Sequence, residues 1–174
     1  MRGKRVIALC VAMALSRVAV AGACDSDAAT GTNATFPNHA IVANSSLINE
    51  KGKYLIRIEL TNCTTHDLAI RKNSLPWVGV GNLLWYAYYL QGKKPIDAPI
   101  KFIGAAPDSM DLGKAQTIAG TIPMASLVGQ SQFREIDANI SRDGIVLFWS
   151  STVRGVDDKQ YVVGDWLVVA PKGD

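Results

Sequence analysis

Apolar and polar residues alternate most regularly between residues 53 and 63, and this alternation predicts a β-strand. Because successive side chains of a strand point to opposite faces, a period of two indicates a sheet with one face on a hydrophobic core. The core-facing positions are Tyr54, Ile56, Ile58 and Leu60, and the opposite positions are Arg57, Glu59 and Thr61.

Short apolar runs separated by turn residues continue from Ala40 to the end of the chain. They predict strands at residues 68–70, 83–91, 100–103, 117–122, 133–140, 145–153 and 161–170. Turns are predicted at residues 62–67, 92–95, 111–114, 141–144 and 155–160, with one helical turn at 123–128. Residues 145–149 are apolar on both faces, which indicates a central, covered strand. The sequence therefore predicts an all-β fold, an antiparallel sandwich of about seven to eight strands.

Four short motifs within residues 40–125 resemble the immunoglobulin-like β-sandwich domains of secreted proteins. They are an alternating strand ending in Thr61-Asn62, an aliphatic strand followed by Leu75-Pro76, the sequence Leu90-Gln-Gly92, and the turn at Leu112-Gly113. The pattern is similar to the non-catalytic N-terminal domains of deuterolysin-type metalloproteases. The resemblance implies an immunoglobulin-like fold and carries over no catalytic residue. The zinc motif His-Glu-x-x-His of those proteases is absent around both histidines, His39 and His66.

The first 23 residues have the features of a secretion signal. An apolar run at residues 6–15 leads to a small-residue exit at residues 21–23, and the run is too short to cross a bilayer. The basic residues that precede this run are Arg2, Lys4 and Arg5. We expect cleavage after Ala23, a flexible lead-in at residues 24–38 and one β-sandwich domain at residues 39–174. These features predict a periplasmic or secreted protein.

Cleavage would change the charge of the chain. The whole chain has 18 basic and 15 acidic residues, but four of the basic residues, at positions 2, 4, 5 and 17, lie in the signal. The remaining 14 basic and 15 acidic residues leave the mature part nearly neutral. The basic isoelectric point therefore gives no reason to expect nucleic-acid binding.

Two cysteines, Cys24 and Cys63, follow the signal, and an even pair in an exported protein predicts one disulfide. Cys24 also has a competing use. A small-residue stretch before a cysteine at the cleavage point resembles the bacterial lipoprotein signal, in which that cysteine is lipidated, although Ala21 stands where the usual leucine would be. Lipidation and the disulfide exclude each other, because the lipid and Cys63 would have to bond to the same sulfur atom of Cys24. Lipidation would make the chain a lipoprotein on a bacterial membrane.

Candidate catalytic groups are few. With only two histidines, a three-histidine zinc site is excluded. Cys63 and His66 could pair as nucleophile and base, and His66, Asp67 and Ser150 could be drawn as a hydrolase triad. No Gly-x-Ser-x-Gly sequence supports the triad. Aspartates at positions 108, 111, 157 and 158 could coordinate calcium, but such residues are more often solvated turns. The sequence thus predicts no catalytic residue, no metal and no cofactor.

Aromatic residues around the strand at 83–91 are the strongest candidates for binding. Tyr86 and Tyr88 share one face of this strand, while Trp85 and Tyr89 share the other. One set is expected in the core and the other at the surface, where aromatic side chains favour protein and carbohydrate contacts. The candidate ligand-binding residues are Trp77, Asn82, Trp85, Tyr86, Tyr88 and Tyr89.

These observations favour an exported, non-enzymatic protein-binding module, such as an inhibitor, an immunity-type protein or an accessory protein that docks to another exported protein. A first alternative is an envelope structural or assembly component, anchored to the membrane if Cys24 is lipidated. A second is a small hydrolase that uses His66. Four Asn-x-Ser/Thr sequences begin at Asn33, Asn44, Asn62 and Asn139 and would matter only in a eukaryotic secretory pathway.

Overall fold

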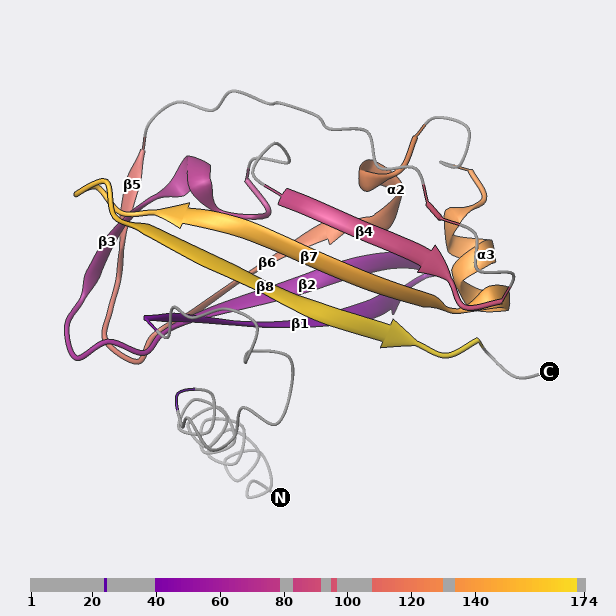
Figure 1. Ribbon diagram of the computed structural model, residues 1–174, viewed down its shortest axis with the longest axis horizontal. Coiled ribbons are helices and arrows are strands. Elements are labelled where there is room, and N and C mark those ends of the chain that lie inside the picture. The colour runs from indigo at the N-terminus through magenta and orange to yellow at the C-terminus, as the bar shows by residue number, and fades with distance from the viewer. Residues whose placement is uncertain are drawn as a thin grey trace, which may run out of the picture.

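Antiparallel β-strands dominate the computed structural model, which describes residues 24, 40–78, 83–91, 95–96, 108–129 and 134–171 (Figure 1). In chain order the strands are β1 (Ile41–Glu50), β2 (Lys53–Asn62), β3 (Leu68–Arg71), β4 (Leu83–Tyr89), β5 (Ser109–Leu112), β6 (Thr117–Pro123), β7 (Ile145–Arg154) and β8 (Gln160–Val169). The short helices of the described residues are the 3₁₀ turn η3 (Lys72–Ser74), α2 (Met124–Leu127) and α3 (Ile136–Asp143).

Two three-stranded sheets form the body of the fold. One has the strand order β1-β2-β6 and the other β4-β7-β8, and every neighbouring pair is antiparallel. Figure 1 shows the β4-β7-β8 sheet lying over the β1-β2-β6 sheet, with the small β3-β5 sheet at one end. These orders correspond to strands A-B-E and C-F-G of an immunoglobulin domain. The predicted antiparallel immunoglobulin-like sandwich is therefore confirmed.

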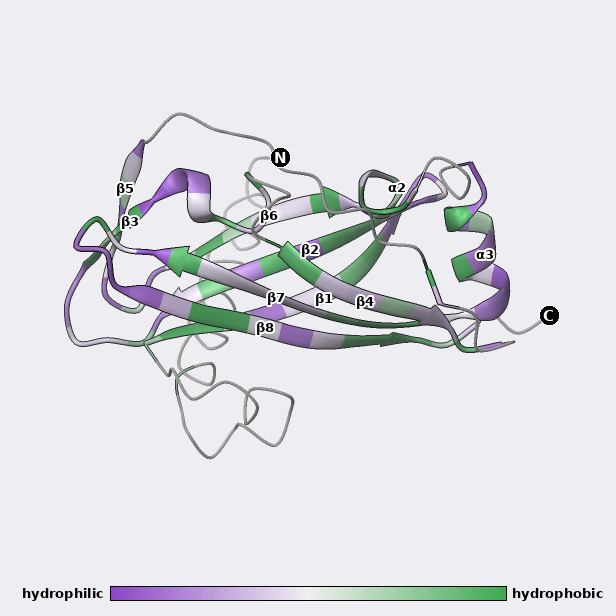
Figure 2. Cartoon of the chain, turned by 45° about the horizontal axis from the view of Figure 1, so that its top comes forward, coloured by the Kyte–Doolittle hydropathy of each residue, from purple (hydrophilic) through white to green (hydrophobic). Residues whose placement is uncertain are grey.

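The core lies between the faces that the two sheets turn toward each other. Ile56, Ile58 and Leu60 of β2 are fully buried, as the alternation in the sequence predicts. Trp149 is fully buried on the central strand of the other sheet. Bands of hydrophobic and hydrophilic residues alternate along these strands (Figure 2). Each strand thus contributes every second side chain to one continuous core.

A polar bridge connects the two sheets beside this core. The indole N–H of Trp149 donates to the hydroxyl oxygen of Ser45 at 3.0 Å. That hydroxyl and the backbone N–H of Ser45 both donate to Oδ2 of Asp165, at 2.7 and 2.9 Å. Asp165 is buried on β8, so its carboxylate is satisfied by hydrogen bonds from another sheet and by the backbone N–H of Trp166 at 2.8 Å.

The turn after β2 is organised by the fully buried side chain of Asn62. Its amide nitrogen donates to the carbonyl oxygens of His66, Leu112 and Gly113 at 2.9, 2.9 and 3.2 Å. Its amide oxygen accepts from the backbone N–H and the hydroxyl of Thr64 at 2.9 and 2.7 Å. The side-chain amide is enclosed, and both its nitrogen and its oxygen are hydrogen-bonded. We therefore interpret the Asn-x-Thr sequence at Asn62 as a structural element of the turn.

Cys63 follows this turn residue directly and forms the predicted disulfide with Cys24. The two Cα atoms are 5.4 Å apart, across a sequence separation of 39 residues. Since the disulfide uses the sulfur of Cys24, it disfavours the lipidated alternative. A disulfide of this kind indicates an oxidising compartment. The predicted signal at residues 1–23 lies outside the described residues, and none of the helices within them is long and apolar enough to span a membrane.

Three predictions about local structure differ from the structure. Residues 133–140 were expected to form a strand and 141–144 a turn, but helix α3 covers most of both segments. Ile136 and Ile140 are four residues apart and both fully buried, which is the spacing of one helical face. The helix ends at Gly144, whose φ of 67° suits a glycine after a helix. The expected turn at 111–114 begins later, because Asp111 and Leu112 still belong to β5.

The remaining expected elements agree with the structure to within a few residues, apart from the strand at 100–103 and residues 92–94, which lie outside the described residues. α2 takes the place of the expected helical turn at 123–128. β1 and β5 had no specific prediction, because their sequences lack a clear alternation.

We expect Leu60→Ala and Trp149→Ala each to lower the free energy of unfolding by about 3 kcal/mol or more, because both side chains are fully buried. Leu84→Ala is the matched control, since Leu84 is 50% exposed and should cost less than about 1 kcal/mol. Denaturant unfolding of the disulfide-bonded protein measures all three. A loss below about 1 kcal/mol at both Leu60 and Trp149 would contradict this core.

We expect Asp165→Ala to lower the free energy of unfolding by about 2–4 kcal/mol, because it removes the acceptor of two hydrogen bonds from Ser45. Ser45→Ala should cost less, since the backbone N–H of that residue keeps its carboxylate partner. The double variant should lose less than the two single losses added together. A double-mutant cycle measures this coupling, and strictly additive losses would argue against a coupled bridge between the sheets.

Candidate functional site

The aromatic strand β4 divides its side chains between the core and the surface. Leu83, Trp85, Ala87 and Tyr89 point inward and are buried. Tyr86 and Tyr88 point outward, together with Leu84 and Leu90, and Tyr86 is 59% exposed. The sequence alone left open which aromatic set would be exposed, and the structure assigns Tyr86 and Tyr88 to the surface.

The other candidate residues contribute to packing or lie outside the described part of the chain. Trp85 is buried in the core, and burial raises the pKa of the Tyr89 phenol, whose oxygen accepts a hydrogen bond from Asn139 at 3.4 Å. Trp77 packs against the core with its indole ring over Gly120, where any Cβ would overlap the ring. Asn82 lies outside the described residues.

The outward side chains of β4 continue across β7 and β8 as one surface, which we call the uncharged face. Strand register aligns Tyr86 with Phe148 and Trp166 in one row across the sheet. Neighbouring positions on the same side give further rows of apolar and small residues. The uncharged face consists of Leu84, Tyr86, Tyr88, Leu90, Val146, Phe148, Ser150, Thr152, Val162, Gly164, Trp166 and Val168.

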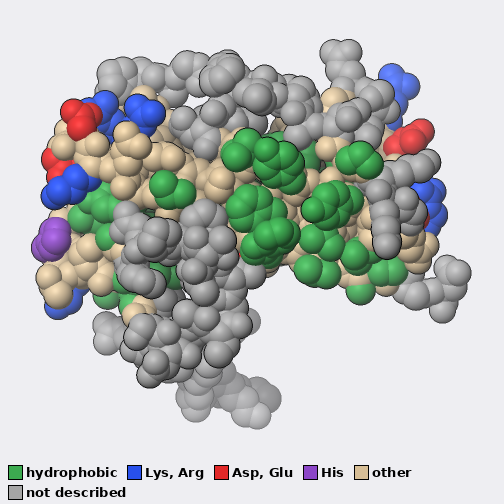
Figure 3. Space-filling view, in the orientation of Figure 1, with side chains coloured by type: hydrophobic (Ala, Val, Ile, Leu, Met, Phe, Trp, Pro, Cys, Tyr) green, Lys and Arg blue, Asp and Glu red, His purple; other side chains and the backbone are tan. Residues whose placement is uncertain are grey.

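This face is exposed and unusually apolar. Trp166 is 42% and Val168 67% exposed. The rings of Phe148 and Trp166 lie with their centroids 4.7 Å apart and tilted by 47°, a geometry typical of aromatic pairs. Hydrophobic side chains gather over the middle of the front sheet in Figure 3. The first charged residue on this side of β7 is Arg154, at the strand's end. The uncharged face is therefore a patch large enough to mark an interaction site.

The central strand was expected to be covered on both faces, and this expectation is only half right. β7 is central, with β4 and β8 on either side, and its inner side chains are buried. Its outer side chains, such as Phe148, are only half-buried beside neighbours that are themselves exposed. The apolar outer residues of β7 and β8 were thus missed as binding candidates, although Val162, Trp166 and Val168 carry the same alternating signal as Tyr86 and Tyr88.

The outer face of the opposite sheet carries charged and polar residues among apolar ones such as Ile48 and Leu55, so an uncharged exterior is not a general property of these strands. Arg57 and Glu59 are neighbours on that face and form an ion pair at 3.0 Å. Asn44 and Ser46 are exposed on β1. Thr121 is exposed on β6, opposite Arg57 in the strand register. The contrast between the two sheets makes the uncharged face a specific feature of one side of the molecule.

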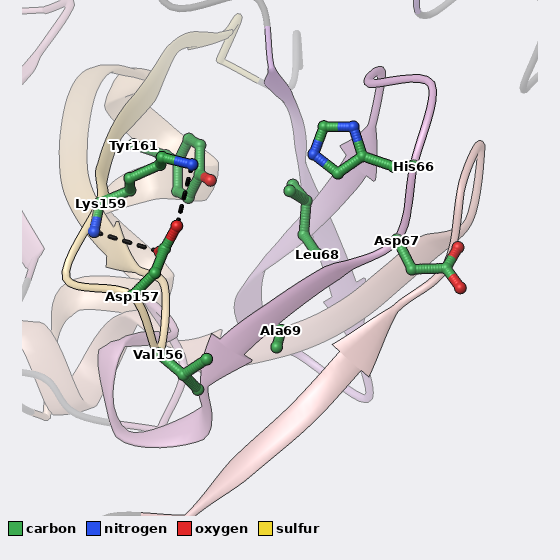
Figure 4. Close-up of a pocket in the computed structure, with 8 residues that line it drawn as sticks. All are labelled: His66, Asp67, Leu68, Ala69, Val156, Asp157, Lys159 and Tyr161. Atoms are coloured by element: carbon green, nitrogen blue, oxygen red, sulfur yellow. Dashed lines mark hydrogen bonds and ion pairs between the residues drawn. The ribbon is translucent and has the colours of Figure 1, made fainter.

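Two of the groups considered for catalysis, Cys63 and Asp67, are engaged elsewhere in the structure. Cys63 is in the disulfide and has no thiol to act as a nucleophile. His66 borders a shallow cavity of about 290 Å³, which Tyr161 and Lys159 also line. Asp67 points away from His66 in Figure 4, and its Oδ1 accepts a hydrogen bond from the backbone N–H of Lys114 at 2.7 Å. Asp67, which would orient His66 in a triad, therefore binds the backbone of Lys114 instead.

Three of the four aspartates considered for calcium pair with basic side chains. A hydrogen bond from Lys72 at 2.7 Å lowers the pKa of Asp108. The Lys159 ammonium, 2.9 Å away, lowers the pKa of Asp157 in the same way. Asp158 accepts from Arg71 at 2.6 Å. Within the described part of the chain, no group of three or more acidic, histidine or cysteine side chains could hold a metal ion.

Comparisons with known proteins add structural likeness only. No family model and no curated protein matches the chain. A protein solved by X-ray crystallography as a structural-genomics target is similar over 75% of this chain and 84% of its own, with 8% identity and a TM-score of 0.39. A crystal structure described as the ApaA protein from Bordetella pertussis is similar over 77% and 94%, with 9% identity and a TM-score of 0.40. These values assign neither a family nor a function.

We expect the two faces of β4 to respond differently to substitution. Trp85→Ala and Tyr89→Ala should each lower the free energy of unfolding by about 3 kcal/mol or more, because these rings are buried. Tyr86→Ser and Tyr88→Ser should cost less than about 1 kcal/mol, because they remove exposed rings. Urea unfolding compares the four variants. Equal losses on both faces would show that the outer tyrosines are covered in solution.

Proposed function

We propose that the chain is an exported, non-enzymatic protein-binding module that docks to its partner through the uncharged face. One observation carries the proposal: three neighbouring strands present exposed aromatic and aliphatic side chains with no charge among them. Such a surface is costly to leave in water and gains free energy when a partner covers it. Inhibitors, immunity-type proteins and accessory proteins all act by binding of this kind.

The chemistry of the face suits a protein better than a charged ligand. No carboxylate or ammonium has to be stripped of water when the face is covered, so little of the gain from burial is lost. The hydroxyl groups of Tyr86 and Tyr88 and the indole N–H of Trp166 can donate hydrogen bonds at its margin. Tyrosine and tryptophan are also the residues that contribute most to binding energy in protein interfaces.

The disulfide and the sequence of residues 1–23 support export to the periplasm or the medium. The envelope alternative loses its proposed anchor, because Cys24 pairs with Cys63. The hydrolase alternative is weakened because Cys63 is in the disulfide and the carboxylate of Asp67 accepts a hydrogen bond from Lys114. Binding without catalysis is the function that these observations support best.

Affinity capture tests the proposal. The tagged chain, purified with its disulfide intact, is exposed to the exported proteins of its host beside a Tyr88→Ser copy and a Val156→Ser copy. Tyr88 and Val156 are nearly equally exposed, at 46% and 48%, but only Tyr88 lies on the uncharged face. We expect one protein, identified by mass spectrometry, to bind the parent chain and Val156→Ser, and to bind Tyr88→Ser at least about tenfold more weakly.

The captured protein is then purified and its affinity measured directly by calorimetry. Equal binding to all three copies would place the contact elsewhere on the molecule. Retention of nothing by the parent chain would count against a protein-binding function. Untagged copies of the chain itself are scored separately, so that self-association is distinguished from the binding of another protein.

A further inference from the structure

We infer that the partner of the uncharged face is a second copy of this chain, which pairs with it face to face about a twofold axis. The inference rests on the proposed function and names the occupant of the same site. It is carried by three properties of the face: its lack of charge, its area, and its position on a regular sheet.

The lack of charge is the first property. When a surface meets its own copy, any charged group near the centre faces an equal charge or is buried without a partner, and either outcome is costly. The uncharged face contains no such group, and Arg154 stands only at the end of β7. The opposite sheet, with Arg57 and Glu59 on its outer face, lacks this property. Only one of the two sheet exteriors can therefore meet itself without burying a charge.

The exposed area is the second property. Of the large apolar side chains that are exposed among the described residues, all except Val78 and Val156 belong to the uncharged face. With about 200 Å² for a fully exposed large side chain, their exposed parts amount to roughly 700 Å² on each copy. A stable protein interface buries about 800 Å² on each partner. The face is therefore close to the size that a lasting dimer needs.

The apolar composition of the uncharged face is more typical of a permanent interface than of a transient one. Interfaces that form and dissociate are about as polar as the rest of a protein surface, whereas homodimer interfaces are more apolar. A chain that met its partner only after export would expose this face until then. A second copy is present wherever the chain itself is, and twofold dimers are the commonest form of soluble oligomer.

The geometry of the face is the third property. It is the outside of a regular antiparallel sheet, and two such sheets commonly pack face to face about 10 Å apart. The two main sheets of this chain also pack face to face around one core. Phe148 is on the central strand, between Tyr86 and Trp166 in the aligned row. In a twofold interface the residues nearest the axis meet their own copies. Phe148 is thus placed to lie against Phe148 of the other copy.

Sedimentation equilibrium of the exported chain, with its disulfide intact, tests the inference over the micromolar range. We expect a dimer for the parent chain. Tyr86→Glu and Phe148→Glu should raise the dimer dissociation constant at least about 100-fold, because Phe148→Glu brings two like charges together and Tyr86→Glu buries a charge without a partner. Thr121→Glu is the matched control, since it adds the same charge at an exposed position of the opposite sheet, and it should remain a dimer.

A mixing experiment identifies a twofold contact. Phe148→Lys and Phe148→Glu, each monomeric alone, should associate when mixed, because opposite charges then meet across the axis. Failure of the mixture to associate while both variants remain folded would overturn this axis. If Phe148 variants fail to fold, Tyr86→Glu decides the matter, since Tyr86 is the more exposed of the two.

Two further results would overturn the inference. One is a parent chain that stays monomeric at all concentrations, and the other is a dimer that survives Tyr86→Glu. Neither result decides the proposed function. A monomer that captures another exported protein through Tyr88 would keep the protein-binding function and change only the partner. A monomer that captures nothing would remove both.

Discussion

The pleat of a β-strand sends successive side chains to opposite faces, and most of this structure follows from how its two main sheets use that constraint. In β1-β2-β6 the inner positions are mostly apolar, and the outer ones include polar and charged residues such as Arg57 and Glu59, so burying the inner face leaves an exterior that water can solvate. In β4-β7-β8 both sets are largely apolar, and the sandwich can bury only one of them. The core and the uncharged face are therefore two results of one arrangement.

Directional bonds fix how the sheets lie on each other, which apolar packing alone does not. Trp149 and Asp165 belong to one sheet and Ser45 to the other, and their hydrogen bonds connect the sheets at one register. At one end of the sandwich, Asn62 ties the turn after β2 to the end of β5, and the disulfide at Cys63 connects the N-terminal lead-in to the same turn. Because these groups are buried and paired, displacing a sheet would leave several polar atoms without partners.

The disulfide was predicted from the two cysteines that follow the signal. The pattern of apolar residues was sufficient to predict β2 from its alternation, β4, β7 and β8 from apolar and aromatic runs between turns, and so the sandwich. It was misleading at α3, because Ile136 and Ile140 are compatible with a strand as well as with a short helix when only a few residues are compared. For the candidate site, the aromatic residues at 85–89 left two possible exposed faces of β4. Choosing between them required knowing that Trp85 and Tyr89 face the other sheet, and cross-strand register added Phe148 and Trp166, which lie some 60 to 80 residues away along the chain. Neither the buried face of β4 nor the cross-strand register can be predicted from the pattern of residues within one strand.

The edges of the sheets indicate how the exposed face can be used. An open strand edge offers unpaired N–H and C=O groups to any other strand, and proteins commonly block it. At the edge of β4, Ile96 donates its N–H to the carbonyl oxygen of Ala87, and Pro95 bridges to Tyr88. At the edge of β1, the N–H of Ser45 is taken by the carboxylate of Asp165. Both edges are thus partly closed to strand addition while the uncharged face stays open. At these two edges strand addition is therefore less favourable than association through side chains packed face to face, which is also how the two sheets of the sandwich are held together.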